Sequence, residues 1–110
     1  EAKELAAEGS EEEGDYPLIE LFASSVSGNR TIKSHIRKIE DAFESHDIEY
    51  TYMDTASDEQ AKLYLKRKSP HQGVLPQIFV DGRFKCLYEE FAHVLETGDL
   101  YDYFEIDPEA

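Results

Sequence analysis

Apolar residues in the first half of the chain form a continuous run and then a helical stripe. Residues 18–23 are almost entirely apolar, which is typical of a strand covered on both faces at the centre of a sheet. A helix from about Arg30 to Glu44 is predicted by apolar residues at intervals of three or four: Ile32, Ile36, Ile39 and Phe43. Residues 48–53 are rich in β-forming side chains and predict a second strand. Because a helix connects these strands, we expect them to be parallel.

The middle of the chain predicts a second helix and a β-hairpin. The segment Ser57-Asp58-Glu59-Gln60 is a capping pattern, and the helix that follows it ends in Lys66-Arg67-Lys68. Pro76 cannot donate to a sheet, so the next strand must begin at or after it. Asp81-Gly82 joins two strand-like runs, 77–80 and 83–86, and favours a tight type I′ turn because both positions tolerate positive φ.

Two helices complete the chain. Residues 87–97 carry apolar side chains at helical spacing, and Asp99 can cap a short helix after them. The predicted order is therefore βαβαββα followed by a short C-terminal helix, which is an α/β arrangement. With 110 residues, of which 40% are apolar, the chain can build one small domain with its own core.

The charge is strongly negative and concentrated at the beginning of the chain. A formal net charge of −14 argues against nucleic acid or an anionic membrane as the main partner, since both require a positive surface. Residues 1–15 hold seven acidic residues and one basic residue. We expect this segment to be a linker, either disordered or the end of an upstream helix, followed by a domain over residues 16–106 and a tail over 107–110. The chain does not begin with Met, and we expect it to be part of a longer protein.

Few residues offer chemistry. Cys86 is the single cysteine, so no internal disulfide can form, and a reducing, cytoplasmic location is expected. The sequence contains neither an apolar run near 18 residues nor a signal-peptide pattern. The histidines do not have metal-ligand spacing with Cys86, and no Gly-x-Ser-x-Gly motif is present. We therefore predict neither a metal site nor a cofactor.

One segment, Leu75-Pro76-Gln77-Ile78-Phe79-Val80-Asp81-Gly82, resembles the region around the cis-proline of glutaredoxins. Residues 22–26 resemble the approach to the redox motif of that family. The resemblance covers about residues 17–105. It implies a thioredoxin-like fold of the glutaredoxin type, with a four-stranded mixed sheet flanked by helices, and a cis bond between Leu75 and Pro76.

The chemistry of the family is missing at the matching positions. Where glutaredoxins carry Cys-Pro-Tyr-Cys, this chain carries Ser27-Gly28-Asn29-Arg30. A serine hydroxyl has no accessible thiolate form, so the resemblance implies a chain without disulfide exchange. The glutathione-binding Gly-Gly-Cys-Asp falls on Cys86-Leu87-Tyr88-Glu89, where side chains replace two glycines. Glutathione is therefore not expected as a ligand.

Three segments are similar to the SH3-domain-binding glutamic-acid-rich family, a branch of glutaredoxin-like proteins without redox cysteines: residues 23–28, 76–79 and 88–91. The resemblance implies an adaptor that binds proteins, although the chain has no Pro-x-x-Pro pattern for SH3 domains. The candidate binding groove lies beside the altered redox motif, between two loops that contribute Ser24, Ser25, Val74, Leu75 and Pro76.

Three alternatives stay open. The chain could be a structural or dimerisation domain that caps a longer filamentous protein, which would make it a homodimer. It could be a glutathione-binding or monothiol redox enzyme that uses Cys86. Finally, Ser27-Gly28-Asn29 at a helix start, with Arg30 and Lys33 nearby, could hold a phosphate, although the same residues suffice to cap the helix.

Overall fold

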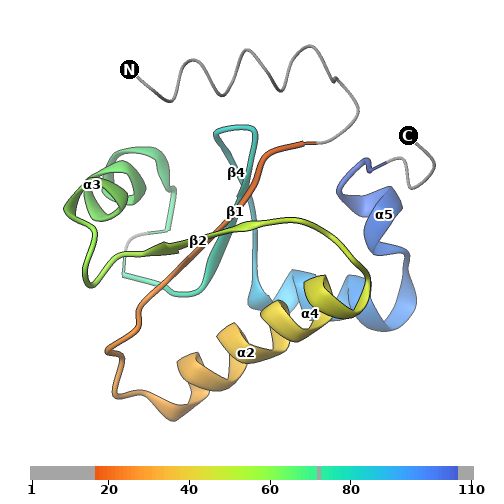
Figure 1. Cartoon of the computed structure of the whole chain (residues 1–110), viewed down its shortest axis with the longest axis horizontal. Coiled ribbons are helices and arrows are strands. Elements are labelled where there is room, and N and C mark those ends of the chain that lie inside the picture. Colours follow the sequence, from red (N-terminus) through yellow and green to blue (C-terminus); the bar gives the residue numbers. More distant parts are fainter. Residues whose placement is uncertain (1–16, 72, 107–110) are drawn as a thin grey trace.

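The computed structural model describes residues 17–71 and 73–106. The predicted linker, residues 1–15, and the tail, residues 107–110, lie outside the described residues. The elements are β1 (Ile19–Ala23), α2 (Arg30–Ser45), β2 (Thr51–Asp54), α3 (Glu59–Lys68), β3 (Gln77–Val80), β4 (Arg83–Leu87), α4 (Tyr88–Thr97) and α5 (Leu100–Tyr103) (Figure 1). The predicted order of elements is confirmed. No helix in the described part is both long enough and apolar enough to cross a lipid bilayer.

The four strands form one mixed sheet in the order β2-β1-β3-β4. β1 is parallel to β2 and antiparallel to β3, and β3 is antiparallel to β4. β1 therefore lies inside the sheet, as its apolar run predicted, and four of its five residues are buried. The helix α2 connects the two parallel strands, and connections of this kind are almost always right-handed.

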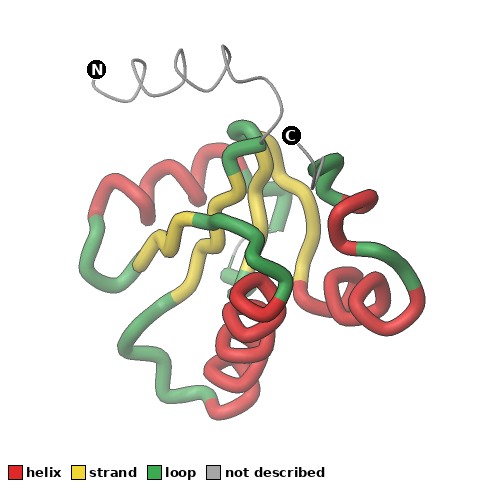
Figure 2. Tube along the Cα trace, turned by 45° about the vertical axis from the view of Figure 1, so that its right-hand side comes forward, coloured by secondary structure: helices red, strands yellow, loops and turns green. Residues whose placement is uncertain are grey.

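Side chains on the two faces of the sheet belong to two separate cores. The main core lies under α2, α4 and α5 and includes Leu21, Ile39, Phe43, Phe91 and Phe104. The small aromatic core lies under α3 and is formed by buried Phe22, Ala61 and Phe79, against which Met53, Tyr64, Leu65 and Phe84 pack. Figure 2 shows α3 on one side of the strands and the other three helices on the opposite side. Alternate residues of β1 and β3 supply the two cores, as the period of a strand requires.

The second strand begins later than predicted, at Thr51 rather than Ile48. Asp47 adopts a φ of 57°, and the N–H of Ile48 donates to the carbonyl of Phe43 at 2.8 Å. These residues close the end of α2, and the side chain of Ile48 packs into the main core. The β-forming composition of residues 48–50 therefore serves the end of a helix, and the chain enters the sheet only afterwards.

The start of α3 uses a different cap within the predicted pattern. The carboxylate of Asp58 accepts hydrogen bonds from the N–H groups of Gln60 and Ala61, at 3.0 and 3.2 Å. The hydroxyl of Ser57 instead donates to Asp54 at 2.9 Å. The capping pattern thus predicted the helix, but it did not predict that Asp58 would cap it while Ser57 bonds Asp54.

The hairpin is the one that the sequence predicted. Asp81 and Gly82 have φ values of 52° and 81°, and a type I′ turn requires positive φ at both positions. The turn is also tied to the start of β1. The N–H of Leu18 donates to the Asp81 carboxylate at 2.9 Å, and the N–H of Asp81 donates to the carbonyl of Leu18 at 2.8 Å.

Candidate functional site

Two loops leave the sheet side by side from the neighbouring strands β1 and β3. Phe22 is paired with Gln77 at the end of the antiparallel ladder. The loop that follows β1, residues 24–29, and the loop that precedes β3, residues 73–76, therefore leave the sheet at the same end of these two strands. The two predicted segments therefore lie at the same end of the sheet, and we call the region that they form the loop site: Ser24, Ser25, Ser27, Gly28, Asn29, Arg30, Val74, Leu75 and Pro76.

The loop after β1 is fastened to the end of β2 by Asp54. One carboxylate oxygen of Asp54 accepts from the N–H of Ser25 at 3.0 Å and from the N–H of Ala56 at 3.0 Å, and the other accepts from Ser57. These hydrogen bonds, chiefly those from Ser25, lower the pKa of Asp54 to about 2. Thr55 reinforces the junction because its N–H and its hydroxyl both donate to the carbonyl of Ala23, at 2.8 and 2.9 Å.

Residues 27–30, which the resemblance to glutaredoxins aligns with the redox motif, form the start of α2. Asn29 is the N-cap, and its side chain accepts from the N–H of Ile32 at 3.1 Å. The hydroxyl oxygen of Ser27 accepts from the N–H of Asn29 at 3.2 Å. Asn29 therefore caps the helix, as the simpler interpretation of this segment expects, and Ser27 holds the backbone of the capping residue. Arg30 and Val26 are exposed, the valine by 75%.

The loop before β3 is anchored from inside by Gln77. The bond between Leu75 and Pro76 is cis, as the resemblance to glutaredoxins implied. Gln77 is 0% exposed, and its amide nitrogen donates to the carbonyls of His71 and Val74, both at 2.7 Å. Its amide oxygen accepts from the hydroxyl of Ser69 at 2.6 Å. A buried polar side chain that satisfies three partners holds its neighbours in one arrangement, so Gln77 fixes the course of this loop.

Neither Asp54 nor Gln77 was identified from the sequence as a residue of the site. Asp54 directly follows the residues predicted as the second strand, and Gln77 was assigned only as the first residue of the third strand. A signal was available for Gln77, because it is the one residue of Gln77–Val80 that is not apolar. A polar side chain in a buried strand needs hydrogen-bond partners, and a loop is the nearest source of free carbonyl groups.

Cys86 does not belong to the loop site. It lies on β4 with 1% of its surface exposed and packs in the main core. Burial raises the pKa of its thiol to about 11. Near it, the hydroxyl of Tyr103 donates to Glu90 at 2.7 Å. Cys86 is therefore a buried side chain of the main core. Among the described residues, no group of three His, Cys, Asp or Glu side chains could hold a metal ion.

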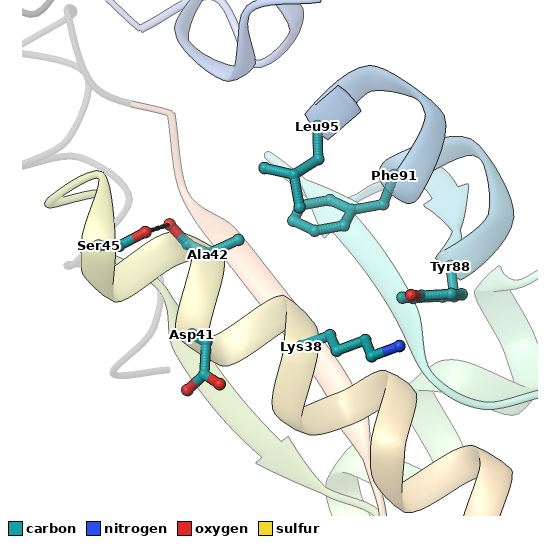
Figure 3. Close-up of a pocket in the computed structure, with 7 residues that line it drawn as sticks. All are labelled: Lys38, Asp41, Ala42, Ser45, Tyr88, Phe91 and Leu95. Carbon is teal, nitrogen blue, oxygen red and sulfur yellow. Dashed lines mark hydrogen bonds between the residues drawn. The ribbon is translucent and has the colours of Figure 1, made fainter. Parts of the chain in front are cut away.

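A pocket of about 350 Å³ lies between α2 and α4 (Figure 3), and no pattern in the sequence predicts it. It is lined by four residues of α2 and three of α4: Lys38, Asp41, Ala42, Ser45, Tyr88, Phe91 and Leu95. Tyr88 stacks on His35, with ring centroids 3.7 Å apart and planes 8° from parallel. This stack fixes the orientation of the Tyr88 ring at one end of the pocket.

Comparison with known proteins identifies the family of the chain and proteins of similar fold. The model of the family "SH3-binding, glutamic acid-rich protein" matches residues 17–107. No curated protein sequence matches the chain. Among solved structures, actin interacting protein Aip5 from C. albicans is similar, with a TM-score of 0.66 and 19% identity over 81% of this chain and 89% of that one.

Two further solved structures have the same fold. Wild-type actin interacting protein 5 (Aip5) has a TM-score of 0.64 and 19% identity, over 82% of this chain and 91% of that one. A monomeric truncated mutant of Trypanosoma brucei 1-C-Grx1, a glutaredoxin-like protein, has a TM-score of 0.61 and 23% identity, over 76% and 74% of the two chains. At these identities the likeness shows the fold alone, and the fold is thioredoxin-like, of the glutaredoxin type.

Proposed function

The chain belongs to the family of SH3-binding, glutamic acid-rich proteins, and we propose that it is a protein-interaction module without thiol–disulfide activity, which binds its partners at the loop site. One observation carries the proposal. The loop with cis Leu75–Pro76 is held in place by buried Gln77, whereas the facing loop presents Ser27 and Arg30 where glutaredoxins carry sulfur. The scaffold of a thiol-binding site is kept while its reactive atoms are absent.

The available side chains support the absence of redox chemistry. Disulfide exchange begins with attack by a thiolate. The Ser27 hydroxyl does not ionise near neutral pH, and its oxygen accepts a hydrogen bond within the helix cap. Cys86 is the single cysteine, and burial holds its pKa at about 11, so its thiolate is scarce at pH 7. These two features together favour binding without catalysis.

The surface of the loop site has the character of a peptide-binding site. Val26 and Val74 are 75% and 39% exposed, one on each loop, and exposed Arg30 adds a positive charge. Proteins of this fold hold an extended peptide beside the cis-proline by backbone pairing. From the resemblance we expect a partner of this chain to pair in the same way beside Pro76. We expect a partner segment with an apolar side chain for the valines and an acidic group near Arg30.

Binding assays with surface variants test the loop site. Arg30→Glu at the first residue of α2 and Val74→Asp in the loop before β3 change exposed residues of the loop site, and Arg37→Glu changes an exposed residue two turns further along α2 as a matched control. Two defined baits are an SH3 domain, chosen from the family name, and purified actin, chosen because two proteins of this fold are named for interacting with it. We expect both loop variants, but not the control, to lose partners that the unmodified chain retains. Identical partner sets for all proteins would contradict the proposal.

A thiol placed at the lost position tests the chemical part of the proposal. Ser27→Cys would put sulfur at the start of α2, where the helix dipole lowers the pKa of a thiol. In the folded state we expect this thiol to react rapidly with an aromatic disulfide reagent at pH 7, while Cys86 of the unmodified chain reacts only as the protein opens. Rapid reaction of Cys86, together with reductase activity toward a glutathione mixed disulfide, would favour the alternative of a monothiol enzyme.

Two further parts of the proposal concern organisation. We propose that residues 16–106 form the folded unit and that residues 1–15 are a linker. Limited proteolysis is expected to remove the linker and leave the domain intact. The alternative of a dimerisation cap is separated by analytical ultracentrifugation, since a module that binds other proteins is expected to sediment as a monomer. A stable dimer at micromolar concentration would favour the cap.

A further inference from the structure

The pocket between α2 and α4 is separate from the loop site. Its α2 residues begin at Lys38, which lies eight positions, or ~12 Å along a helix, beyond Arg30 at the helix start. Ala42 and Phe91 are buried and form its apolar floor, whereas Leu95 is 39% exposed at its edge. In Figure 3 the side chains of Phe91 and Leu95 project from α4 toward α2. The molecule thus has a second concave surface that the proposed function does not use.

The lining of the pocket favours a protein segment over a small molecule. Small-molecule sites usually combine an apolar lining with a few buried polar groups that fix the orientation of the ligand. Here the polar residues at the edge, Lys38, Asp41 and Ser45, are all exposed. The hydroxyl of Ser45 already donates to the carbonyl of Ala42 at 3.2 Å. At about 350 Å³ the pocket accepts one or two large apolar side chains, and the surface around it must supply the remaining specificity.

That surrounding surface is strongly acidic. Residues 38–49 and 88–106, which form the C-terminal part of α2, the segment after it, α4 and α5, contain eleven acidic residues and one basic residue. The other described residues contain five acidic and nine basic residues. Figure 1 shows α4, α5 and the end of α2 gathered at one end of the molecule, with α3 at the other. The pocket therefore opens in a predominantly acidic part of the domain, in which Lys38 of the lining and Lys85, whose ammonium lies 4.4 Å from the centre of the Tyr103 ring, are the basic residues.

Both helices carry exposed carboxylates near the pocket, and Lys38 of its lining extends toward Tyr88 (Figure 3). Asp41 is part of its lining, and Glu44 follows on the next turn of α2. On α4, Glu89 and Glu96 are exposed next to the lining residues Tyr88 and Leu95. Although Lys38 is also part of the lining, the surface around the pocket is predominantly negative, and such a surface attracts a partner of the opposite sign and accelerates its approach. We propose that this pocket docks a basic segment of a partner protein, with an apolar side chain of that segment inserted between α2 and α4.

Matched synthetic peptides test the proposal. The first peptide is an amphipathic helix with two leucines four residues apart and lysines on either side, the second replaces every lysine with glutamate, and the third replaces the leucines with alanine. Fluorescence anisotropy measures binding to the full chain, and backbone amide shifts locate it. We expect only the first peptide to bind, with affinity that falls as salt is raised, and with shifts in residues 38–45 and 88–95.

A pair of leucines in the protein provides the matched control. Leu95→Ala removes an apolar edge of the pocket, and Leu63→Ala changes an equally exposed leucine on α3, since the two are 39% and 42% exposed. We expect Leu95→Ala to lower the affinity for the lysine peptide by about fivefold or more, because methyl groups buried in the complex are lost. Leu63→Ala should leave the affinity within about twofold of that of the unmodified chain. Equal losses in both variants would overturn the proposal.

Two other results would also overturn it. Equal binding of the lysine and glutamate peptides would mean that the acidic surface does not select the partner. The second result would be self-association. The α3 helix itself carries basic residues around exposed Leu63, so a second copy could fill the pocket. Sedimentation as a dimer at the concentration used, lost in Leu95→Ala and in Leu63→Ala, would identify a second copy as the occupant instead of a partner protein.

Discussion

The two faces of the sheet are built differently. Fourteen buried residues form the main core under α2, α4 and α5, whereas the small aromatic core under α3 contains three. The small core depends on contacts between few rings: Phe22 is stacked on Tyr64 with centroids 5.6 Å apart, and Phe22 and Phe79 are tilted at 5.1 Å. Because stabilisation by burial grows with the apolar area removed from water, most of it lies on the main-core face.

The loop site is attached to the weaker face. Phe22 is the last residue but one of β1 before the first loop, and Phe79 follows Gln77 by two positions on β3. Regions with few buried contacts open at a lower free energy than the main core of a domain. We therefore expect substitutions in the two cores to have different effects on the stability of the domain and on the geometry of the loop site. Damage to the main core unfolds the whole domain, and damage to the small core loosens the loop site first.

The largest effect is expected from Phe43→Ala in the main core. The Phe43 ring contacts Tyr50, Phe91 and Phe104, with centroid distances of 5.0, 5.4 and 5.7 Å. Removing a buried ring costs ~3–5 kcal/mol, which is a large part of the ~5–15 kcal/mol that stabilises a typical domain. Urea denaturation measures the loss, and Phe43→Leu is the milder control. A loss of stability smaller than that of the variants on the α3 side would contradict the view that the main core supplies most of the stability.

A smaller and more local effect is expected from Tyr64→Ala on α3. Tyr64 stacks on Phe22, meets Phe79 edge-on, and donates its hydroxyl to the carbonyl of Gly82 at 3.2 Å. Loss of this half-buried ring is expected to cost ~2–3 kcal/mol, and Tyr64→Phe, which removes only the hydrogen bond, ~1 kcal/mol. Amide hydrogen exchange should rise in residues 22–29 and 74–79 before it rises in α2. Equal acceleration in α2 would show that the two faces open as one unit.

Gln77→Leu is expected to act on one loop alone. It keeps the volume of the side chain nearly constant but removes the hydrogen bonds that Gln77 donates to the carbonyls of His71 and Val74 and the one that it accepts from the hydroxyl of Ser69. We expect a cost of ~1–2 kcal/mol and broadened amide signals in residues 69–76. Gln60→Leu, at an exposed glutamine of α3, is the matched control. Unchanged signals in the variant would mean that the loop does not depend on Gln77.

Local signals explain what the sequence predicted well. The run at residues 18–23, the stripe from Ile32 to Phe43 and the Asp81-Gly82 turn each determine structure from neighbouring residues, and each was predicted within a residue or two of its observed limits. The match around Leu75–Pro76 supplied the fold type and the cis bond. The nine residues of the loop site were identified through that resemblance and not through their own chemistry.

Contacts between distant elements explain what the sequence did not predict. Ile48 was predicted to begin a strand because residues 48–53 are rich in β-forming side chains. In the structure its N–H donates to Phe43 at the end of α2, and its side chain packs in the main core. The pocket between α2 and α4 joins residues about 50 positions apart, and no local pattern shows that two helices stop short of full contact there. The support of the loop site by Asp54 and Gln77 likewise depends on pairing across the sheet.

The smallest expected effect concerns the pH dependence of the loop that Asp54 fastens. Hydrogen bonds, chiefly from Ser25, lower the pKa of Asp54 from 3.8 to about 2 in the folded state. A depressed folded pKa stabilises the structure above the unfolded pKa, and the contribution is lost as the pH falls from about 4 to about 2. Because Asp54 is partly exposed, the change in global stability should be slight, and the small aromatic core should stay closed. The amide signal of Ser25 should therefore titrate near pH 2, and Asp54→Asn should abolish this step. A midpoint near pH 4 would show that Asp54 does not hold the loop, leaving Thr55 and the helix cap to position it.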